Sequence, residues 1–232
     1  MTLDFSRFEA LTFDCYGTLV DWETGIFSVL KPILQSHGKL VSDAKLLELY
    51  GELEAEVEAG PYISYREVLC SVVRDLGKRL SFTPTVEEVN LLPLSVPRWR
   101  TWPDSVAALH SLAERFRLAI ISNIDDELFE ATRPHLRTEF QSVTTAEQAQ
   151  CYKPGLDIFR KALSRVGVEG SRVLHVGQSV YHDVLPAQSL GLATVWVNRP
   201  SPRAGIGAVK AAQGTPDLEV PDMASLAERA AS

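Results

Sequence analysis

The sequence predicts an α/β protein: a doubly wound, parallel, Rossmann-like core that carries an inserted helical cap domain. From about residue 103 onward, apolar strand-like stretches alternate with segments of helical spacing. Such alternation is typical of right-handed crossovers between parallel strands. Residues 21–100 show helical spacing without strand-like alternation. We therefore expect a core domain made of residues 1–20 and 101–232, and a cap domain made of residues 21–100.

The first half of the chain begins with one strand and continues with helices. An apolar run that ends at Phe13 predicts a buried strand. Apolar residues at helical spacing predict three helices, at 25–37, 43–59 and 64–77. Thr85 and Glu88 have the spacing of a capping box, which predicts the start of a short fourth helix.

The second half alternates strands and helices. Apolar runs predict strands at 118–121, 141–145, 173–176 and 193–197. Helical spacing predicts helices at 104–114, 126–136, 155–166 and 180–190. Residues 198–217 are rich in Pro, Gly and Ala and predict a loop, and residues 218–231 predict a short strand and a terminal helix.

The composition is that of an ordinary globular protein, with 45% apolar and 23% charged residues among 232. The net charge of −7 argues against a nucleic-acid partner, because such proteins carry basic surfaces. No apolar run approaches the length of a membrane span, and the N-terminus lacks a signal-peptide pattern. Three scattered cysteines show no metal-type spacing, which favours reduced thiols and a cytoplasmic location: Cys15, Cys70 and Cys151. For Cys15 we expect a small, buried, apolar role.

A polar motif follows the first predicted strand. Asp14 begins the turn Asp-Cys-Tyr-Gly-Thr, which ends at Thr18. Ligand sites of open α/β sheets lie at the carboxyl ends of their strands, so this carboxylate is a candidate catalytic group. The simpler alternative is that Asp14 only caps a turn.

Three further motifs follow later core strands. Ser122-Asn123 follows the second core strand, where a hydroxyl and backbone N–H groups can hold an anion. Lys153-Pro154 offers an ammonium group that would lower the pKa of Asp14 and offset developing charge. Gln178-Ser179 follows the strand at 173–176, and Asp183 lies in the next helix. Taken singly, Ser122-Asn123 fits a helix N-cap better and Lys153 a surface position better, and their places in the order of strands favour the functional roles.

The four motifs, their order and the cap insertion resemble the haloacid dehalogenase (HAD) superfamily. The Asp-x-Tyr-Gly-Thr form resembles its L-2-haloacid dehalogenase branch. This resemblance implies that Asp14 is a covalent nucleophile that forms an aspartyl ester. It implies further catalytic residues, namely Lys153, Asp183, Thr18 and Tyr16. It also implies substrate-binding residues, namely Ser122, Asn123, Tyr16, Gln178 and Ser179.

Two positions distinguish dehalogenation from phosphate-ester hydrolysis. HAD phosphatases usually carry a second aspartate at the position of Tyr16, which protonates the leaving alkoxide, whereas a halide needs no proton. They also carry a magnesium-binding aspartate at the position of Gln178, and an amide is the weaker ligand for a hard cation. We therefore predict hydrolysis of a small 2-halo acid with no metal or other cofactor.

Two other functions remain open at this point. One is a magnesium-dependent phosphatase that acts on a small phosphate monoester, with Asp183 as a ligand. The other is a HAD-fold protein that binds a metabolite or partner without turnover. The resemblance is also compatible with a homodimer.

The chain departs from the L-2-haloacid dehalogenases it resembles. Those enzymes carry a cap arginine that faces the substrate, but no arginine occurs here between Arg7 and Arg66, and Gly51 falls near the expected position. Their fourth motif has Ser and Asn where this chain has Gln178 and Val180, and Phe159 replaces a tyrosine. These differences concern halide binding and substrate size.

Simple structural roles are predicted for several other polar and aromatic residues. We expect His182 to be an exposed helix histidine. Asp125 and Asp126 are expected to face the dipole of the helix that they open. Trp22 is expected to pack at the junction of core and cap. Three cap residues are candidates to line the pocket: Tyr62, Tyr65 and Arg66.

Overall fold

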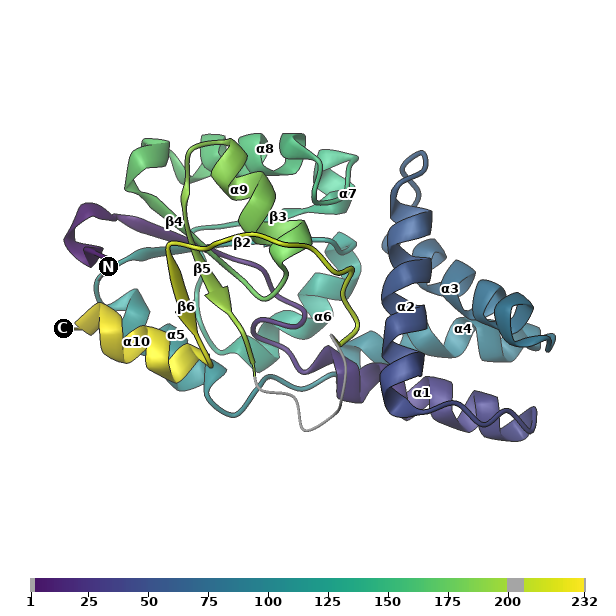
Figure 1. Ribbon diagram of the computed structural model, residues 1–232. Helices are drawn as coiled ribbons and strands as arrows, with labels where there is room; N and C mark the ends of the chain where they lie inside the picture. Colours follow the sequence, from purple (N-terminus) through teal and green to yellow (C-terminus); the bar gives the residue numbers. More distant parts are fainter. Residues whose placement is uncertain (1–2, 200–206, 232) are drawn as a thin grey trace.

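A six-stranded parallel sheet forms the centre of the computed structural model, which describes residues 3–199 and 207–231 (Figure 1). The strands lie in the order β3-β2-β1-β4-β5-β6, and every neighbouring pair is parallel. Their bounds are β1 Ala10–Phe13, β2 Arg117–Ser122, β3 Ser142–Thr145, β4 Val173–Gly177, β5 Ala193–Val197 and β6 Leu218–Val220. This arrangement confirms the predicted doubly wound α/β fold.

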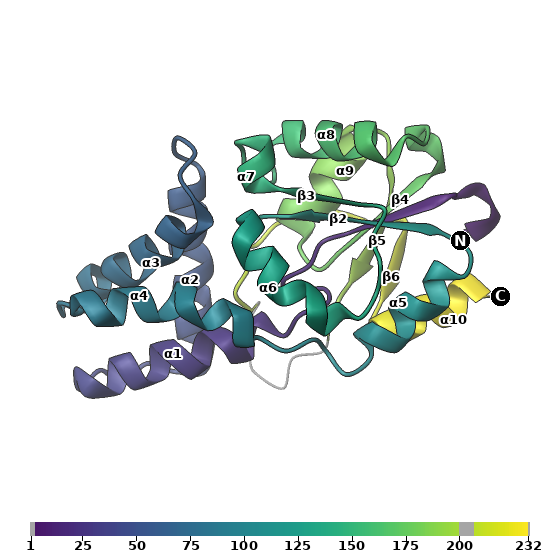
Figure 2. The ribbon, with the colours of Figure 1, turned by 180° about the vertical axis from the view of Figure 1, so that it is seen from behind.

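Helices cover both faces of the sheet. They are α5 Ser105–Ala113, α6 Asp126–Leu136, α7 Ala146–Ala149, α8 Leu156–Val166, α9 Leu185–Ser189 and α10 Met223–Ala231. Figures 1 and 2 show α8 and α9 on one face and α5 and α10 on the other. Every residue of β1 and of β4 is buried as a result. This explains why the sequence of the central strands is continuously apolar or of low polarity rather than alternating.

Four helices between β1 and α5 form a group beside the sheet (Figures 1 and 2). They are α1 Trp22–Ser36, α2 Asp43–Glu58, α3 Tyr65–Leu80 and α4 Val86–Ser95. Helix α3 packs against α2 and α4, and α4 packs against α1. The predicted capping box is present at the start of α4, where Thr85 and Glu88 each accept the other's backbone N–H. We propose that these helices are the cap domain and the sheet with its helices the core domain.

The structure differs from the prediction mainly in its short elements. The helix predicted at 180–190 is a π-helical turn, Val180–Val184, followed by α9. Three 3₁₀ turns were not predicted: Phe5–Arg7, Val96–Arg98 and Gly170–Arg172. Part of the predicted loop at 198–217, residues 200–206, lies outside the described residues. Within the described ranges, no helix has the length and apolar character that crossing a bilayer requires.

Candidate active site

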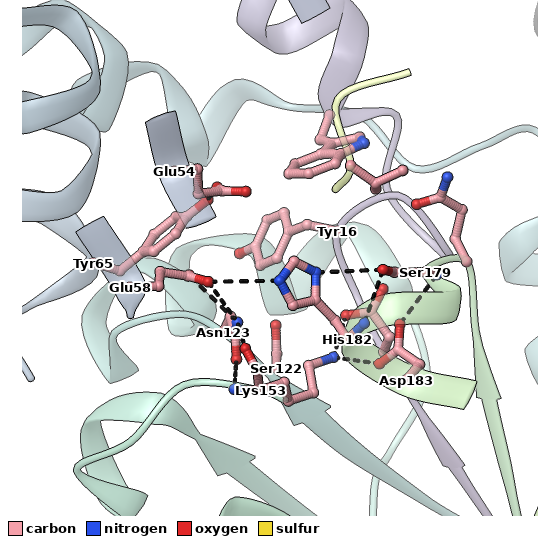
Figure 3. A pocket seen from close by; sticks show the side chains of 14 residues that line it. Tyr16, Glu54, Glu58, Tyr65, Ser122, Asn123, Lys153, Ser179, His182 and Asp183 are labelled. Atoms are coloured by element: carbon pink, nitrogen blue, oxygen red, sulfur yellow. Dashed lines mark hydrogen bonds and ion pairs between the residues drawn. The ribbon is translucent and has the colours of Figure 1, made fainter. Parts of the chain in front are cut away.

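The candidate site lies at the carboxyl ends of three adjacent strands. Asp14 follows β1, Ser122 ends β2, and Gln178 follows β4. These strands are neighbours in the order β2-β1-β4, so the crossovers leave β1 toward both edges of the sheet. A crevice forms where the strand order reverses in this way. A cavity of about 40 Å³ lies there, and residues of α2 close it from the helical side (Figure 3).

Lys153 lies between two buried carboxylates. Its Nζ donates to Asp14 Oδ1 at 2.8 Å, to Asp183 Oδ1 at 2.7 Å and to the backbone oxygen of Ile121 at 3.1 Å. Lys153 is 1% exposed and Asp183 also 1%. The structure therefore brings together three residues that the sequence separates by up to 169 positions (183 − 14).

The protonation of this trio follows from its contacts. Burial disfavours the charge on Lys153, but the carboxylates of Asp14 and Asp183 outweigh burial and raise its pKa. Burial also opposes ionisation of Asp183, yet Lys153 and His175 hold its pKa well below the ordinary value. For Asp14, burial and the charge of Asp183 raise the pKa, although hydrogen bonds from Lys153 and Thr18 favour the ionised form. Lys153 is therefore an ammonium shared by two acids.

Thr18 fixes the second oxygen of the candidate nucleophile. Its Oγ1 donates to Asp14 Oδ2 at 2.7 Å and accepts from the backbone N–H of Gln178 at 2.8 Å. The turn between Asp14 and Thr18 requires Gly17, whose φ of +99° disfavours other residues. A Cβ at Gly17 would also lie 2.9 Å from Gln178 Oε1. Gly17 and Thr18 together thus fix the orientation of the Asp14 carboxylate.

Asp183 is held from several sides. The Nε2 of His175 lies 3.3 Å from Asp183 Oδ1, and its Nδ1 lies 2.9 Å from Thr12 Oγ1. The backbone N–H of Ser179 donates to Asp183 Oδ2 at 3.2 Å. Gly177 permits this approach, because a Cβ there would be 2.4 Å from the Cβ of Asp183. Asp183 is thereby fixed on the π-helical turn and directed at Lys153.

The residues present fit a divalent metal ion poorly. All four carboxylate oxygens of Asp14 and Asp183 already accept protein hydrogen bonds. Lys153 supplies the positive charge between them, and the side chain at position 178 is an amide. In the described part of the chain, no group of three or more His, Cys, Asp or Glu residues could hold a metal ion. A hard cation prefers several charged oxygen ligands.

Several predicted substrate-binding side chains are engaged within the protein. Tyr16 lines the cavity, and its hydroxyl lies 2.8 Å from Thr132 Oγ1. The Asn123 amide bonds the backbone N–H and oxygen of Lys153 at 2.7 and 3.1 Å. Ser179 accepts the backbone N–H of His182 at 3.0 Å. These side chains position the site, and their roles toward a substrate remain predictions.

The expectation for His182 is wrong, and Asp125 makes contacts that the sequence did not predict. His182 is buried, with a relative exposure of 9%, and it lines the cavity. The π-helical turn on which it lies directs it inward. Burial lowers its pKa to about 4, so its ring is neutral near pH 7. Asp125 opens α6 as its N-cap residue, as expected, but its side chain makes no capping hydrogen bond there and instead accepts the backbone N–H groups of Tyr65 and Arg66 at 2.7 and 2.8 Å. It therefore joins α6 to the start of α3.

The remaining residues singled out in the sequence lie partly at the cavity and partly away from it. Tyr65 lines the cavity, whereas Tyr62 lines a neighbouring cavity and the Arg66 guanidinium lies 3.5 Å from Glu127. Trp22 is buried at the start of α1 and packs edge-to-face on Tyr50. Asp126 accepts from Thr145 Oγ1 and Gln148 Nε2. Cys15 is buried, and burial raises the pKa of its thiol well above the ordinary value, which fits a structural role.

The sequence reasoning missed two acids of α2 that line the cavity, Glu54 and Glu58. Both follow Tyr50 at steps of four residues, and Tyr50 belongs to the predicted apolar face of the same helix. Charged residues at the border of an apolar helix face were the signal that could have found them. At Gly51, near the position where the family resemblance implies an arginine, a Cβ would lie 3.0 Å from the backbone of Ala208 and Val209. The chain segment at 208–209 therefore fills the space beside Gly51.

The comparisons with known proteins agree with this geometry. A family model described as haloacid dehalogenase-like hydrolase matches residues 8–191. The chain belongs to this family. Haloacid dehalogenase-like hydrolase domain-containing protein 3 of Mus musculus is 34% identical over 207 residues, which is 83% of this chain and 82% of that protein. The match to the Danio rerio protein of the same name, 37% identical, spans only 43% of that protein.

Similar proteins also include named dehalogenases. Haloacetate dehalogenase H-2 of a Moraxella strain is 26% identical over 223 residues, covering 94% of this chain and 95% of that protein. The structure of L-2-haloacid dehalogenase from Xanthobacter autotrophicus matches with a TM-score of 0.78 and 19% identity, covering 95% of this chain and 97% of that chain. At this identity the structural likeness shows the fold alone. The HAD-like chain therefore resembles the dehalogenase branch in fold and in its first motif.

Proposed function

We propose that this HAD-family hydrolase cleaves the carbon–halogen bond of a small 2-halo acid, with Asp14 as nucleophile and without a metal ion. The observation that carries the proposal is the position of Lys153. Its Nζ lies within 2.8 Å of both Asp14 and Asp183, so the nucleophile has its counter-charge inside the protein. Tyr16 stands where a phosphatase has its acid, and its hydroxyl is paired with Thr132. A reaction whose leaving group needs no proton fits this arrangement.

The first step forms a covalent intermediate. A carboxylate oxygen of Asp14 attacks the halogen-bearing carbon, the new C–O bond forms, and the halide leaves with the bonding electron pair. Lys153 and Thr18 each hold one Asp14 oxygen, which fixes the direction of attack. Both oxygens retain a lone pair for the reaction, because each accepts a single protein hydrogen bond.

The second step returns the free enzyme. Water attacks the carbonyl carbon of the Asp14 ester, and the acyl C–O bond breaks. The departing alkoxide takes up one proton of that water and leaves as a 2-hydroxy acid, and the other proton is released to solvent. Lys153 stabilises the charge that develops on the carbonyl oxygen. Asp183 keeps Lys153 in place for both steps.

One labelling experiment tests this proposal. Halide release from 2-chloropropanoate is measured with and without EDTA, for the wild type and for D14N. We expect release that EDTA does not change and that D14N lacks. A single turnover in H₂¹⁸O should place ¹⁸O in Asp14, detected by peptide mass spectrometry, since water attacks the enzyme's acyl carbon.

Other outcomes would contradict it. Magnesium-dependent phosphate release from an aryl phosphate, without halide release, would support a phosphatase instead. The absence of both activities, together with thermal stabilisation by a ligand, would support a binding protein. Label found only in the product would exclude the aspartyl ester.

A further inference from the structure

The cap side of the cavity is lined by two acids that the proposed reaction does not use. Glu54 is 4% exposed, and the Glu58 side chain is 5% exposed. Figure 3 shows both glutamates across the pocket from Lys153 and Asp183.

These two carboxyl groups have neutral partners. Glu54 Oε1 accepts from the Tyr50 and Tyr65 hydroxyls at 2.8 and 2.7 Å. Glu58 accepts from the Asn123 amide at 3.2 Å, and the neutral ring of His182 lies 3.8 Å away. Within the described residues, neither glutamate forms an ion pair with a lysine or arginine. Lys153 is already shared by Asp14 and Asp183.

A buried carboxylate without a cation is costly, and a proton is the simplest remedy. Burial is the main reason that the pKa of Glu54 rises to about 7. Burial and the charge of Glu54 raise the pKa of Glu58 well above its ordinary value. In the free protein, a proton therefore takes the place that a cation would fill.

A second observation, on the core side, indicates a polar ligand. Ser122 is 1% exposed, lines the same cavity, and its Oγ finds no hydrogen-bond partner among the described residues. Figure 3 shows this hydroxyl pointing into the pocket. An unpaired buried hydroxyl is unfavourable until something bonds it. The cavity thus offers a donor for an oxygen on the core side and acceptors for a cation on the cap side.

We propose that the substrate is a zwitterion: a short 2-halo acid whose side chain carries an ammonium group, bound by Glu58 and Glu54. The substrate carboxylate lies toward Ser122, the halogen-bearing carbon faces Asp14, and the ammonium group replaces the cap proton. Glu58 and Glu54 are then specificity-determining residues. The halogenated carbon rests on the proposed function, but the cation site stands on the α2 acids themselves.

The proposal sets a pH dependence. The titratable groups that line the cavity with the two glutamates are Asp14, Asp183, Lys153, His182 and Tyr65. The Tyr50 hydroxyl bonds Glu54 from within α2, and the charge of Lys210 acts on His182 from the 207–217 segment. Binding of an ammonium group to the protonated site releases a proton, so affinity rises with pH between about 6 and 8. A 2-halo acid without the amine binds more weakly over the same interval, because the glutamates become anionic.

Two isosteric substrates test the selectivity. In 3-amino-2-chloropropanoate, an ammonium group replaces the terminal methyl group of 2-chlorobutanoate. At pH 8 we expect kcat/KM for halide release to be about tenfold or more higher for the amine than for 2-chlorobutanoate. A tenfold ratio corresponds to about 1.4 kcal/mol. E58Q and E54Q should each reduce this ratio, whereas E56Q should keep it, because Glu56 lies on the exposed side of the same helix, 62% exposed.

A binding measurement separates this inference from the proposed function. Calorimetry compares 3-aminopropanoate with butanoate, neither of which can react, in two buffers that differ in ionisation enthalpy. We expect tighter binding of the amine with proton release, and loss of that preference in E58Q; this result supports the cation site even if no substrate releases halide. Equal binding of the two acids, or faster hydrolysis of 2-chlorobutanoate, would overturn the inference and leave the dehalogenase proposal standing. Should E58Q fail to fold, E54Q provides the same comparison.

Discussion

Two pairs of buried acids face each other across the cavity, and their surroundings differ. Asp14 and Asp183 belong to the core and share the ammonium of Lys153. Glu54 and Glu58 belong to α2 and have hydroxyl, amide and neutral imidazole partners. Burial acts on all four, but only one pair has a cation to offset it. Asp183 has a lowered pKa, whereas burial raises the pKa of Glu54 and Glu58, so partners as well as depth decide whether a buried acid carries charge.

Removing the shared cation should have the largest effect. K153M leaves two buried carboxylates without a counter-charge, which we expect to destabilise the fold by about 3–5 kcal/mol. Halide release should fall by about 10³-fold, because Asp14 loses a contact that positions and balances it. Chemical denaturation and a halide assay measure the two effects. K78M is the control, since Lys78 is 79% exposed, and a K153M protein as stable as K78M would show that Lys153 does not balance the acids.

The cap pair should instead make stability depend on pH. Folding raises the pKa of Glu54 from its ordinary 4.5 to about 7, so the folded protein binds the proton more tightly than the unfolded chain. The resulting stability is present below about pH 4.5 and is lost as pH rises to about 7, a change of about 3 kcal/mol. E54Q should remove this part of the slope. Urea unfolding of the wild type and E54Q at pH 5 and pH 8 measures this difference. If the free energy of unfolding changed equally between the two pH values in both proteins, the raised pKa could not belong to Glu54.

The contact that joins the two regions should have a smaller effect. Asp125 accepts the first two backbone N–H groups of α3, so D125A should destabilise the protein by about 1–2 kcal/mol, as the loss of a helix cap does. Hydrogen exchange should quicken in the first turn of α3. E127A is the matched control, because Glu127 is 86% exposed. Unchanged exchange in D125A would mean that other contacts hold α3.

Ser122 should show the smallest effect on stability. Its hydroxyl makes no hydrogen bond within the described residues, so S122A should unfold within about 0.5 kcal/mol of the wild type. T18A offers the contrast, because Thr18 bonds both Asp14 and Gln178 and its loss should cost about 1–3 kcal/mol. Denaturation midpoints compare the two variants. A large loss of unfolding free energy in S122A would mean that the Ser122 hydroxyl has a hydrogen-bond partner that the structure does not contain.

The sequence by itself determined the parallel sheet, the inserted helices and the candidate nucleophile with its lysine. Apolar runs and helical spacing are local signals, and motifs at strand ends must meet at one edge of a parallel sheet. Only the tertiary structure decided the protonation and direction of the polar residues. The inward turn of His182, the contact of Asp125 with α3 and the neutral partners of Glu54 and Glu58 depend on the folded arrangement of the chain. The charge of a buried group depends on its solvation and its partners, and folding alone brings these together.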